Sequence, residues 1–235
     1  MEKFITMIPC FILARTTSER LPGKHFLPLG DVCSIEHMVL RCQHFGFEPF
    51  LCVPKGDYDA FNQTTTCIDI FEGDMDVETR LMECATHYNI KFFHALDGDD
   101  PFFDPYSILD SINAARQARL YKVTPSYNSQ SGTGRMGTTY NLEAPAGGVR
   151  NLMDAGGHVW PQRLTVDYQE DYALAAMIAR MLGGYMAPRQ QVDELFIRNP
   201  ALYQIYWFRN AEWKERQEHE HRERIREAVR QQSGG

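Results

Sequence analysis

The fold of this chain is decided by one stretch near its start, Ile8-Pro9-Cys10-Phe11-Ile12-Leu13-Ala14-Arg15-Thr16-Thr17-Ser18-Glu19-Arg20-Leu21-Pro22-Gly23-Lys24. Its first six residues are continuously apolar, which is typical of a β-strand covered on both faces. The remainder carries Arg15, Arg20 and Lys24 among hydroxyl side chains and turns at Pro22-Gly23. Cations and backbone N–H groups on such a loop can converge on an anion, so the loop is a candidate polyphosphate site. A solvated basic connection between a strand and a helix is the alternative.

The composition predicts a folded protein with an acidic surface. The 235 residues are 43% hydrophobic and 12% aromatic, enough to bury a full core, and the formal net charge is -7 at pH 7. Non-specific nucleic-acid binding needs an extended basic surface, so one basic loop on an acidic chain favours a small anionic ligand. No apolar stretch approaches the roughly 18 residues that span a bilayer, and the N-terminus lacks a signal-peptide pattern. We therefore expect a soluble, cytoplasmic protein with neither nucleic-acid nor membrane partners.

Short apolar stretches alternate with helical periodicity along the chain, which predicts an α/β fold with a mainly parallel sheet. We expect strands at residues 8–13, 49–53, 67–71, 91–96, 123–127 and 163–167. We expect helices capped by Ser34, by Asp76, by Asp104 with Pro105 and by an Asp167–Glu170 pair, and further helices at residues 188–198 and 210–232. The predicted apolar face of the helix after Asp167 consists of Leu174, Met177, Ile178 and Met181.

The charge distribution divides the chain. Residues 1–208 are predicted to form one domain, and residues 209–235 a charged C-terminal helix or tail. This last segment has few apolar positions and is predicted to be a solvated helix with i to i+4 charge pairs. Its sparse apolar side is a candidate for docking a partner subunit, so a homodimer is one prediction.

The cysteines indicate a reducing environment. No two of the six are spaced as C-x-x-C, and most lie in apolar segments. We therefore expect reduced core thiols at Cys10, Cys33, Cys42, Cys52, Cys67 and Cys84.

Two further loops carry candidate ligands. Asp97-Gly98-Asp99-Asp100-Pro101 follows an expected strand and gathers three carboxylates, which predicts a site for a divalent cation such as Mg²⁺. A solvated acidic turn is the alternative. Residues 129–137 form a glycine-rich polar loop with one cation, in which Gly134 and Arg135 are candidates for close approach to a sugar or phosphate substrate. A mobile segment is the alternative there.

Four segments, in this order, resemble the cytidylyltransferases of the SpsF type, which activate sugars as CMP derivatives, and more distantly the KDO and acylneuraminate cytidylyltransferases. The segments are residues 14–24, 73–80, 98–105 and 163–171. They match Ala-Arg-x-x-Ser-x-Arg-Leu-Pro-Gly-Lys, Gly-x-x-x-Asp-Val-x-x-Arg shortened by one residue, Gly-Asp-x-Pro-x-x-Asp-Pro and Arg-Leu-Thr-Val-Asp-x-x-Glu-Asp. The resemblance covers about residues 5–205 and implies a three-layer α/β/α, Rossmann-like nucleotidyltransferase domain related to the GT-A fold.

The resemblance also implies roles for single residues. Arg15 and Lys24 would act catalytically by holding the phosphates of CTP. Asp99 and Asp167 would hold Mg²⁺ as the cofactor. The full set of implied nucleotide contacts is Ala14, Arg15, Ser18, Arg20, Lys24 and Asp99.

The implied activity is Mg²⁺-dependent transfer of CMP from CTP to a small sugar or sugar acid, with release of pyrophosphate. Two alternatives are open. Asp97-Gly98-Asp99 matches the Asp-x-Asp pattern of glycosyltransferases that use a nucleotide-sugar, and a diverged, non-catalytic relative would bind a nucleotide or serve assembly. The second is favoured by Thr17, which stands in place of a glycine that lets the loop approach the nucleotide. It is also favoured by residues 132–141, which have no counterpart of the acid that the family carries after its Pro-x-Gly segment. Leu13 in place of Pro or Gln is a further departure from the family.

Overall fold

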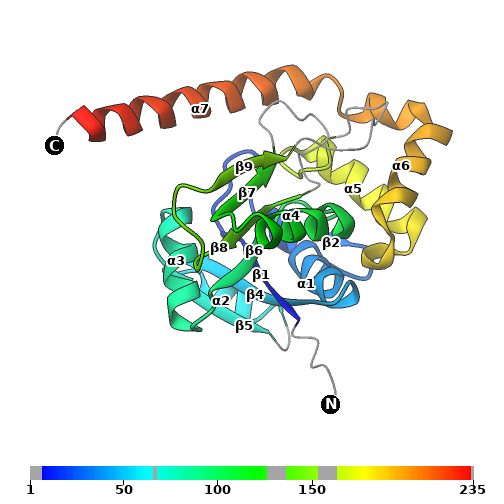
Figure 1. Cartoon of the computed structure of the whole chain (residues 1–235). Helices are drawn as coiled ribbons and strands as arrows, with labels where there is room; N and C mark the ends of the chain where they lie inside the picture. The colour runs from blue at the N-terminus through cyan, green and yellow to red at the C-terminus, as the bar shows by residue number, and fades with distance from the viewer. Residues whose placement is uncertain (1–6, 66–67, 126–135, 153–162, 234–235) are drawn as a thin grey trace, which may run out of the picture.

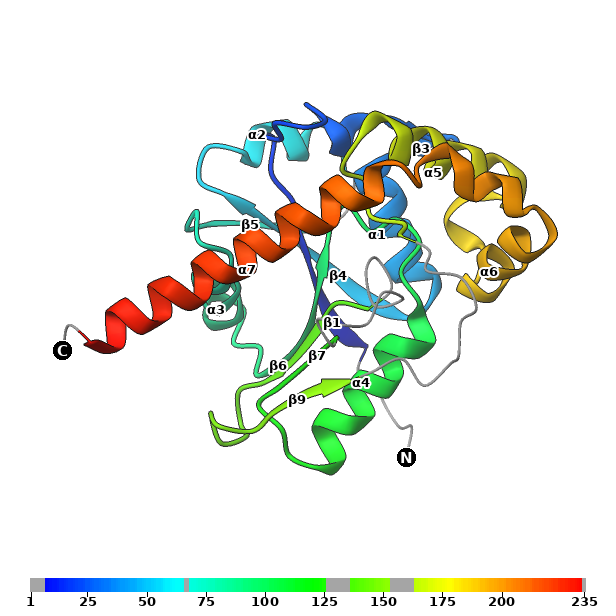
Figure 2. The same cartoon turned by 90° about the horizontal axis from the view of Figure 1, so that it is seen from above.

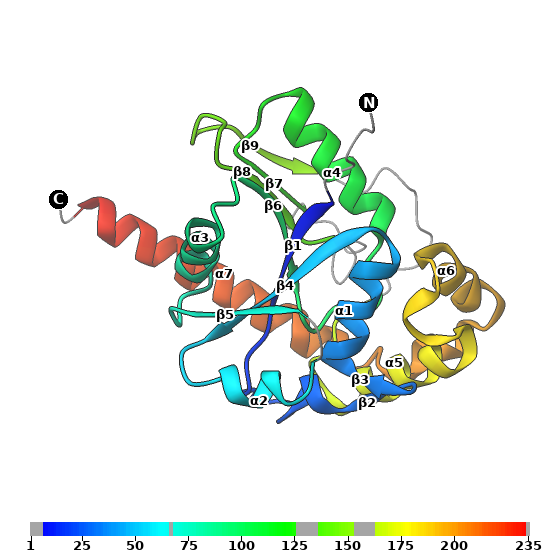
Figure 3. The same cartoon turned by 90° about the horizontal axis from the view of Figure 1, so that it is seen from below.

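The structure of the chain, a computed structural model, describes residues 7–65, 68–125, 136–152 and 163–233 (Figure 1). Within these residues a seven-stranded sheet lies between helices on both faces. Figure 3 shows α1 (Ser34–His44) and α4 (Pro105–Gln117) on one face of the sheet and α3 (Val77–His87) on the other. The predicted three-layer α/β/α architecture is therefore confirmed.

The sheet is mainly parallel. Its strand order is β5-β4-β1-β6-β8-β7-β9, and each described neighbouring pair is parallel except the two that involve β8. The strands are β1 (Ile8–Leu13), β4 (Phe47–Pro54), β5 (Asp69–Gly73), β6 (Phe92–Asp97), β7 (Lys122–Pro125), β8 (Thr138–Asn141) and β9 (Val149–Leu152). A separate antiparallel pair consists of β2 (Pro28–Leu29) and β3 (Val32–Cys33).

Strand β1 is central, and its alternating side chains are covered on both faces, as its sequence predicts. Cys10 and Ile12 belong to a core cluster with the apolar residues of α1 and α4. Phe11 points to the other face and stacks on Phe93 at 4.3 Å between ring centroids, beside the apolar residues of α3. All three β1 side chains are fully buried, which contributes about 1.5–3 kcal/mol for each large apolar side chain.

The C-terminal part of the chain adds a second packed unit beside the sheet. Helices α5 (Gln169–Leu182) and α6 (Arg189–Arg198) form a core cluster with the 3-10 helix η3 (Pro200–Ile205). Helix α7 (Arg209–Ser233) then crosses above the carboxyl ends of the strands, and its far end projects beyond the sheet (Figures 1 and 2). The remaining helical segments are α2 (Tyr58–Asn62), η1 (Lys24–Phe26) and η2 (Gly184–Met186). Among the described residues, none of the helices combines the length and apolar character that crossing a bilayer requires.

Several predicted elements are confirmed with small shifts. The strand predicted at 49–53 is longer by two residues at its start, and the one predicted at 67–71 begins and ends two residues later. Asp76 and Asp104 cap α3 and α4 by accepting hydrogen bonds from Thr79 N–H and Tyr106 N–H. Helices predicted at 188–198 and 210–232 correspond to α6 and α7. The described cysteines are free thiols, and Cys67 lies outside the described residues.

Three local predictions are wrong. Residues 163–167 form no strand, because the Val166 N–H bonds the carbonyl of Asp99, which lies in the turn beyond the end of β6. Ser34 is the first residue of α1 rather than its cap. Met177 and Met181 are exposed (41% and 53%), since α5 turns its alanines to the core in their place.

Candidate active site

The two predicted ligand loops meet at one end of the sheet. Strands β1 and β6 are parallel neighbours, with Leu13 paired to Asp97, so the loops that follow them leave the sheet side by side. A backbone hydrogen bond of 2.8 Å from Gly98 N–H to the Leu13 carbonyl joins the loops directly. The chain passes from β1 to β4 and β5 on one side, and returns to β6 on the other. The junction is therefore the switch point of the sheet, where ligands of open α/β folds bind.

The basic loop after β1 is held in a defined conformation. Thr16 donates from its backbone N–H and its hydroxyl to the two carboxylate oxygens of Asp57, at 2.7 and 2.6 Å. At the other end, Gly23 takes the left-handed conformation (φ 66°), which confirms the predicted turn. This turn starts η1 and brings the Lys24 side chain back to the sheet, where it is 10% exposed.

Lys24 joins the two carboxylates that were predicted to share a metal. Its Nζ donates to Oδ2 of Asp99 and, at 3.2 Å, to Oδ1 of Asp167. A second cation, Arg20, pairs with the same Asp167 oxygen at 3.0 Å. Residues that are distant in sequence therefore form one cluster of two acids and two cations.

The charges in this cluster stabilise one another. Burial alone would lower the pKa of Lys24, but attraction to Asp99 and Asp167 outweighs it and raises that pKa above its usual value. Burial would likewise raise the pKa of Asp99, and the attraction of Lys24 together with their hydrogen bond lowers it instead. Both groups are therefore held in their charged forms at neutral pH.

Asp100 behaves differently from its neighbour Asp99. Its side chain is buried and accepts a hydrogen bond of 2.7 Å from the Thr165 hydroxyl. Burial, followed by repulsion from Asp99 and Asp97, raises the pKa of Asp100 well above its usual value. Asp100 therefore ties the acidic loop to the 163–167 segment, and burial disfavours its charged form.

Asp167 is positioned by a buried ion pair that the sequence did not reveal. Arg163 binds Asp171 through two hydrogen bonds of 2.7 and 2.5 Å, and both side chains are at most 5% exposed. Asp171 also accepts from the backbone N–H groups of Asp167 and Tyr168, at 3.0 and 2.9 Å. The predicted cap by Asp167 and Glu170 is wrong, since Asp171 has this role and the Asp167 carboxylate faces Lys24 instead.

Glycine is required at the junction of the two loops. A Cβ atom on Gly98 would lie 2.7 Å from the Leu13 carbonyl oxygen and 3.2 Å from Cε1 of His25. His25 is buried, and burial lowers its pKa to about 4, so this ring is neutral at physiological pH. The close packing of Gly98 between Leu13 and His25 fixes the direction in which Asp99 leaves the sheet.

The other predicted site residues lie around this cluster. Ala14 is buried and its N–H bonds the Cys52 carbonyl at 3.3 Å, while Arg15 is exposed and Ser18 is half-buried. The positive charge of Arg15 helps to lower the pKa of His25. Gly134 and Arg135 lie outside the described residues.

Two site neighbours were missed by the sequence analysis. Asp57 anchors the basic loop from 41 residues away, and Trp213 of α7 donates its indole N–H to Oδ2 of Asp167 at 3.0 Å. Asp57 stood in a polar stretch without periodicity. Trp213 is one of the few apolar residues in a charged helix, and this feature of the sequence could have indicated a buried contact.

The chemistry of the donor set fits a divalent cation. No group of three or more His, Cys, Asp or Glu side chains with metal-binding geometry occurs in the described part of the chain. Two carboxylates do converge on a single ammonium nitrogen, however, so both oxygens face one cationic position. Mg²⁺ is commonly bound through one or two carboxylates together with substrate phosphates, and Asp99 and Asp167 meet that requirement.

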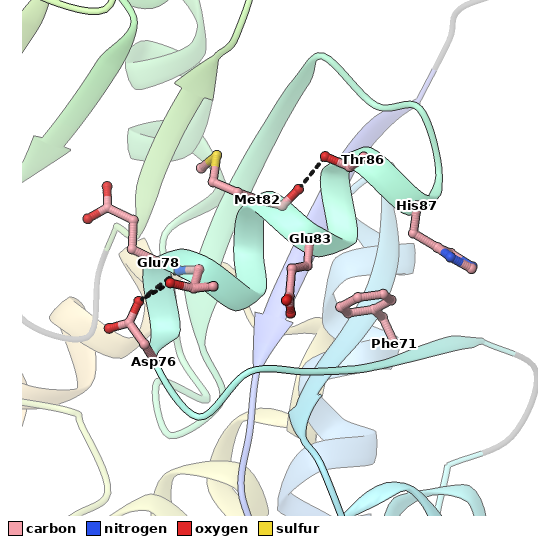
Figure 4. Close-up of a pocket in the computed structure, with 8 residues that line it drawn as sticks. Phe71, Asp76, Glu78, Met82, Glu83, Thr86 and His87 are labelled. Atoms are coloured by element: carbon pink, nitrogen blue, oxygen red, sulfur yellow. Dashed lines mark hydrogen bonds between the residues drawn. The ribbon is translucent and has the colours of Figure 1, made fainter.

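A groove elsewhere on the surface shares no residue with this cluster. It follows the outer side of α3, with Phe71 of β5 at one edge and Asp76, Glu78 and Glu83 along the helix (Figure 4). The bonds drawn there are local to the helix, such as Thr86 hydroxyl to the Met82 carbonyl. The groove is acidic and therefore unsuited to a polyphosphate.

Sheet topology and switch-point loops define an α/β nucleotidyltransferase fold, and solved structures agree. No family model and no curated protein matches the sequence. The chain is similar to a cytidylyltransferase from Leptospira borgpetersenii serovar Hardjo-bovis, with TM-score 0.72 and 21% identity, covering 83% of this chain and 96% of that one. It is also similar to a CMP:2-keto-3-deoxy-manno-octonic acid synthetase solved with CTP, with TM-score 0.56 and 16% identity over 75% and 100% of the two chains. A Mycobacterium tuberculosis H37Rv protein solved with manganese gives TM-score 0.52 and 17% identity over 73% and 99%. The predicted α/β nucleotidyltransferase fold is confirmed.

Proposed function

We propose that this protein is a Mg²⁺-dependent cytidylyltransferase that activates a sugar or sugar acid with CTP. The observation that carries the proposal is the convergence of Lys24 and Arg20 with Asp99 and Asp167 at the carboxyl ends of β1 and β6. In a ligand that contains both a divalent cation and a polyphosphate, the cation is attracted to the two aspartates and the polyphosphate to Lys24 and Arg20. A metal–nucleoside triphosphate is such a ligand.

In the proposed reaction, a hydroxyl oxygen of the acceptor attacks the α-phosphorus of CTP. The new P–O bond replaces the bond to the bridging oxygen, pyrophosphate leaves with that electron pair, and the hydroxyl proton goes to solvent. The products are a CMP-sugar and pyrophosphate. Such a displacement requires positioning and charge stabilisation rather than covalent chemistry from the protein.

The side chains divide this work. Lys24, Arg15 and Arg20 bind the triphosphate and stabilise charge on the leaving pyrophosphate, with Ser18 and the backbone at Ala14 completing the loop. Asp99 and Asp167 would hold Mg²⁺, which when bound neutralises charge on the phosphate oxygens. Gly134 and Arg135, from the glycine-rich loop at residues 129–137, are proposed to contact the acceptor.

Two similar proteins support the choice of nucleotide and metal. The CMP:2-keto-3-deoxy-manno-octonic acid synthetase was solved with CTP, and the Mycobacterium tuberculosis protein with manganese. Mn²⁺ and Mg²⁺ both take carboxylate and phosphate oxygens, so the pair of aspartates suits either. CTP and a divalent cation are therefore the ligands to test first.

The direct test is pyrophosphate release from CTP in the presence of Mg²⁺ and a mixture of sugar acids and sugar phosphates, with the CMP-linked product identified by mass spectrometry. Asp99→Asn should lower the rate about 100-fold or more, since it removes a charge at the reacting centre. The matched control is Asp110→Asn, because Asp110 is exposed on α4, away from the cluster. Equal rates in the two variants would contradict the assignment. Release of UDP from UDP-sugars, with no pyrophosphate from CTP, would favour the glycosyltransferase instead.

A further inference from the structure

Helix α7 contributes a side chain to the candidate active site. Trp213, in the second turn of this helix, donates its indole N–H to Oδ2 of Asp167 at 3.0 Å. The other oxygen of the same carboxylate, Oδ1, accepts from Lys24 and pairs with Arg20. Asp167 is thus held at both oxygens, and the oxygen that Trp213 leaves free, Oδ1, is the one that meets Lys24, which also binds Asp99.

The indole itself is held by the residues that position Asp167. The Arg163 guanidinium lies over the Trp213 ring, 5.5 Å from its centroid, and pairs with Asp171, which binds the backbone N–H of Asp167. Arg163 also donates to Oδ1 of Asn210 in the first turn of α7, at 3.2 Å. One arginine therefore connects α7, the start of α5 and the Asp167 carboxylate.

A further ion pair fixes the start of α7 to the start of α5. Arg209 binds Glu170 at 3.1 Å and, within its own helix, Glu212 at 2.8 Å. Exposed ion pairs of this kind each contribute little to stability. Together with the Arg163 contacts they set the orientation of the first two helical turns, so Trp213 reaches Asp167 from a fixed direction.

We propose that Trp213 is a positioning residue of the cytidylyltransferase site: its indole N–H holds the Asp167 carboxylate so that Oδ1 is directed at the position shared with Asp99. Tryptophan offers one N–H donor and no acceptor, which suits it to orient a carboxylate without competing for the metal. The inference rests on the proposed function for the metal-binding role of Asp167. It also makes the first turns of α7 part of the active site, so a division of the chain at residue 208 separates Asp167 from a contact that it needs.

Trp213→Phe separates this role from simple anchoring of the helix. Phenylalanine keeps an aromatic ring beneath Arg163 and lacks the N–H group. The matched control is Trp207→Phe, since Trp207 is 58% exposed and precedes α7. Mn²⁺ binding to the nucleotide-free protein is measured by isothermal titration calorimetry. Loss of an outer hydrogen bond to a metal ligand weakens metal binding typically 10- to 100-fold, so we expect about tenfold weaker binding in Trp213→Phe. Wild-type affinity is expected in Trp207→Phe.

A second measurement does not depend on how well Trp213→Phe folds. The chain contains three tryptophans, so the double substitution Trp160→Phe with Trp207→Phe leaves Trp213 as the single indole. Its fluorescence should change on Mn²⁺ addition with the same midpoint as the calorimetric titration. Equal Mn²⁺ affinity in wild type and Trp213→Phe, or a fluorescence signal unaffected by bound Mn²⁺, overturns the role of Trp213 alone. Absence of Mn²⁺ binding to the wild-type protein overturns the proposed metal site as well.

Discussion

Replacing Lys24 by methionine tests the candidate site most directly. Methionine keeps an apolar stem of similar length and removes the ammonium group that binds Asp99 and Asp167. The substitution should act in two opposite directions. Pyrophosphate release from CTP should fall about 100- to 1,000-fold, because a preorganised charge at the leaving group is worth about 2.7–4 kcal/mol. Mn²⁺ should bind more tightly to the nucleotide-free protein, because the ammonium no longer competes for the two carboxylates.

The stability cost follows from the geometry of the ion pairs. Removing one partner of a fully buried pair costs about 3–5 kcal/mol. Here Asp167 keeps Arg20 and Trp213, and the Asp99 side chain is 20% exposed, so hydration offsets part of the loss. We expect about 2–3 kcal/mol, which corresponds to a melting temperature lower by about 5–10 °C for a chain of this size.

This stability difference should depend on pH. Lys24 lowers the folded-state pKa of Asp99 below that of the unfolded chain, so the pair contributes fully above the unfolded value near 4. The contribution is lost as the pH falls through the lowered folded value. Urea unfolding of wild type and Lys24→Met should therefore differ most at pH 5–8 and converge in acid. An unchanged rate of pyrophosphate release, with a stability loss as calculated, would refute the catalytic role and leave Lys24 as a purely structural cation.

Two further substitutions address the framework of the site. Asp171→Ala removes both the partner of the buried Arg163 and the carboxylate that caps α5. The free energy of unfolding, measured by urea titration, should fall by about 3–5 kcal/mol. A loss below about 1 kcal/mol would contradict the importance of this ion pair. Gly98→Ala places a Cβ 2.7 Å from the Leu13 carbonyl oxygen and should lower the free energy of unfolding by about 1–3 kcal/mol. The rise in melting temperature on addition of CTP and Mg²⁺ should also be smaller than in the wild type. An unchanged rise would show that the loops tolerate displacement.

The framework of the fold was predictable because its signals are local. A six-residue apolar run such as β1 predicts a strand that is buried on both faces. Because β6 is a parallel neighbour of β1, the loops that follow the two strands lie at the same edge of the sheet. The caps Asp76 and Asp104 were likewise visible, since each bonds a backbone N–H two or three residues away. Lys24 and Asp99 follow from this geometry once the strands are known.

Two of the wrong predictions share a physical cause, which is competition between nearly equal local choices. Asp167, Glu170 and Asp171 all stand where an acid can cap α5, and the selection of Asp171 depends on Arg163, whose buried cation requires a carboxylate within reach. Residues 163–167 have the pattern of a strand but meet the turn at Asp99 instead of a strand edge. Tertiary contacts decided both cases. The contact between Trp213 and Asp167, 46 residues apart, has no periodic signature at all.

The aspartates at 97–100 differ in their surroundings, which bears on the proposed metal site. A motif search treats these aspartates as equivalent, but the fold separates them. The Asp100 carboxyl is buried and already accepts a hydrogen bond from the Thr165 hydroxyl, and burial and its acidic neighbours raise its pKa. Asp99 is kept ionised by Lys24 and is directed by the packing of Gly98 toward Asp167, which comes from the far end of the chain. The proposed cation site would combine one member of the acidic loop with one distant aspartate, and the sequence of the loop alone could therefore not be distinguished from that of a solvated turn.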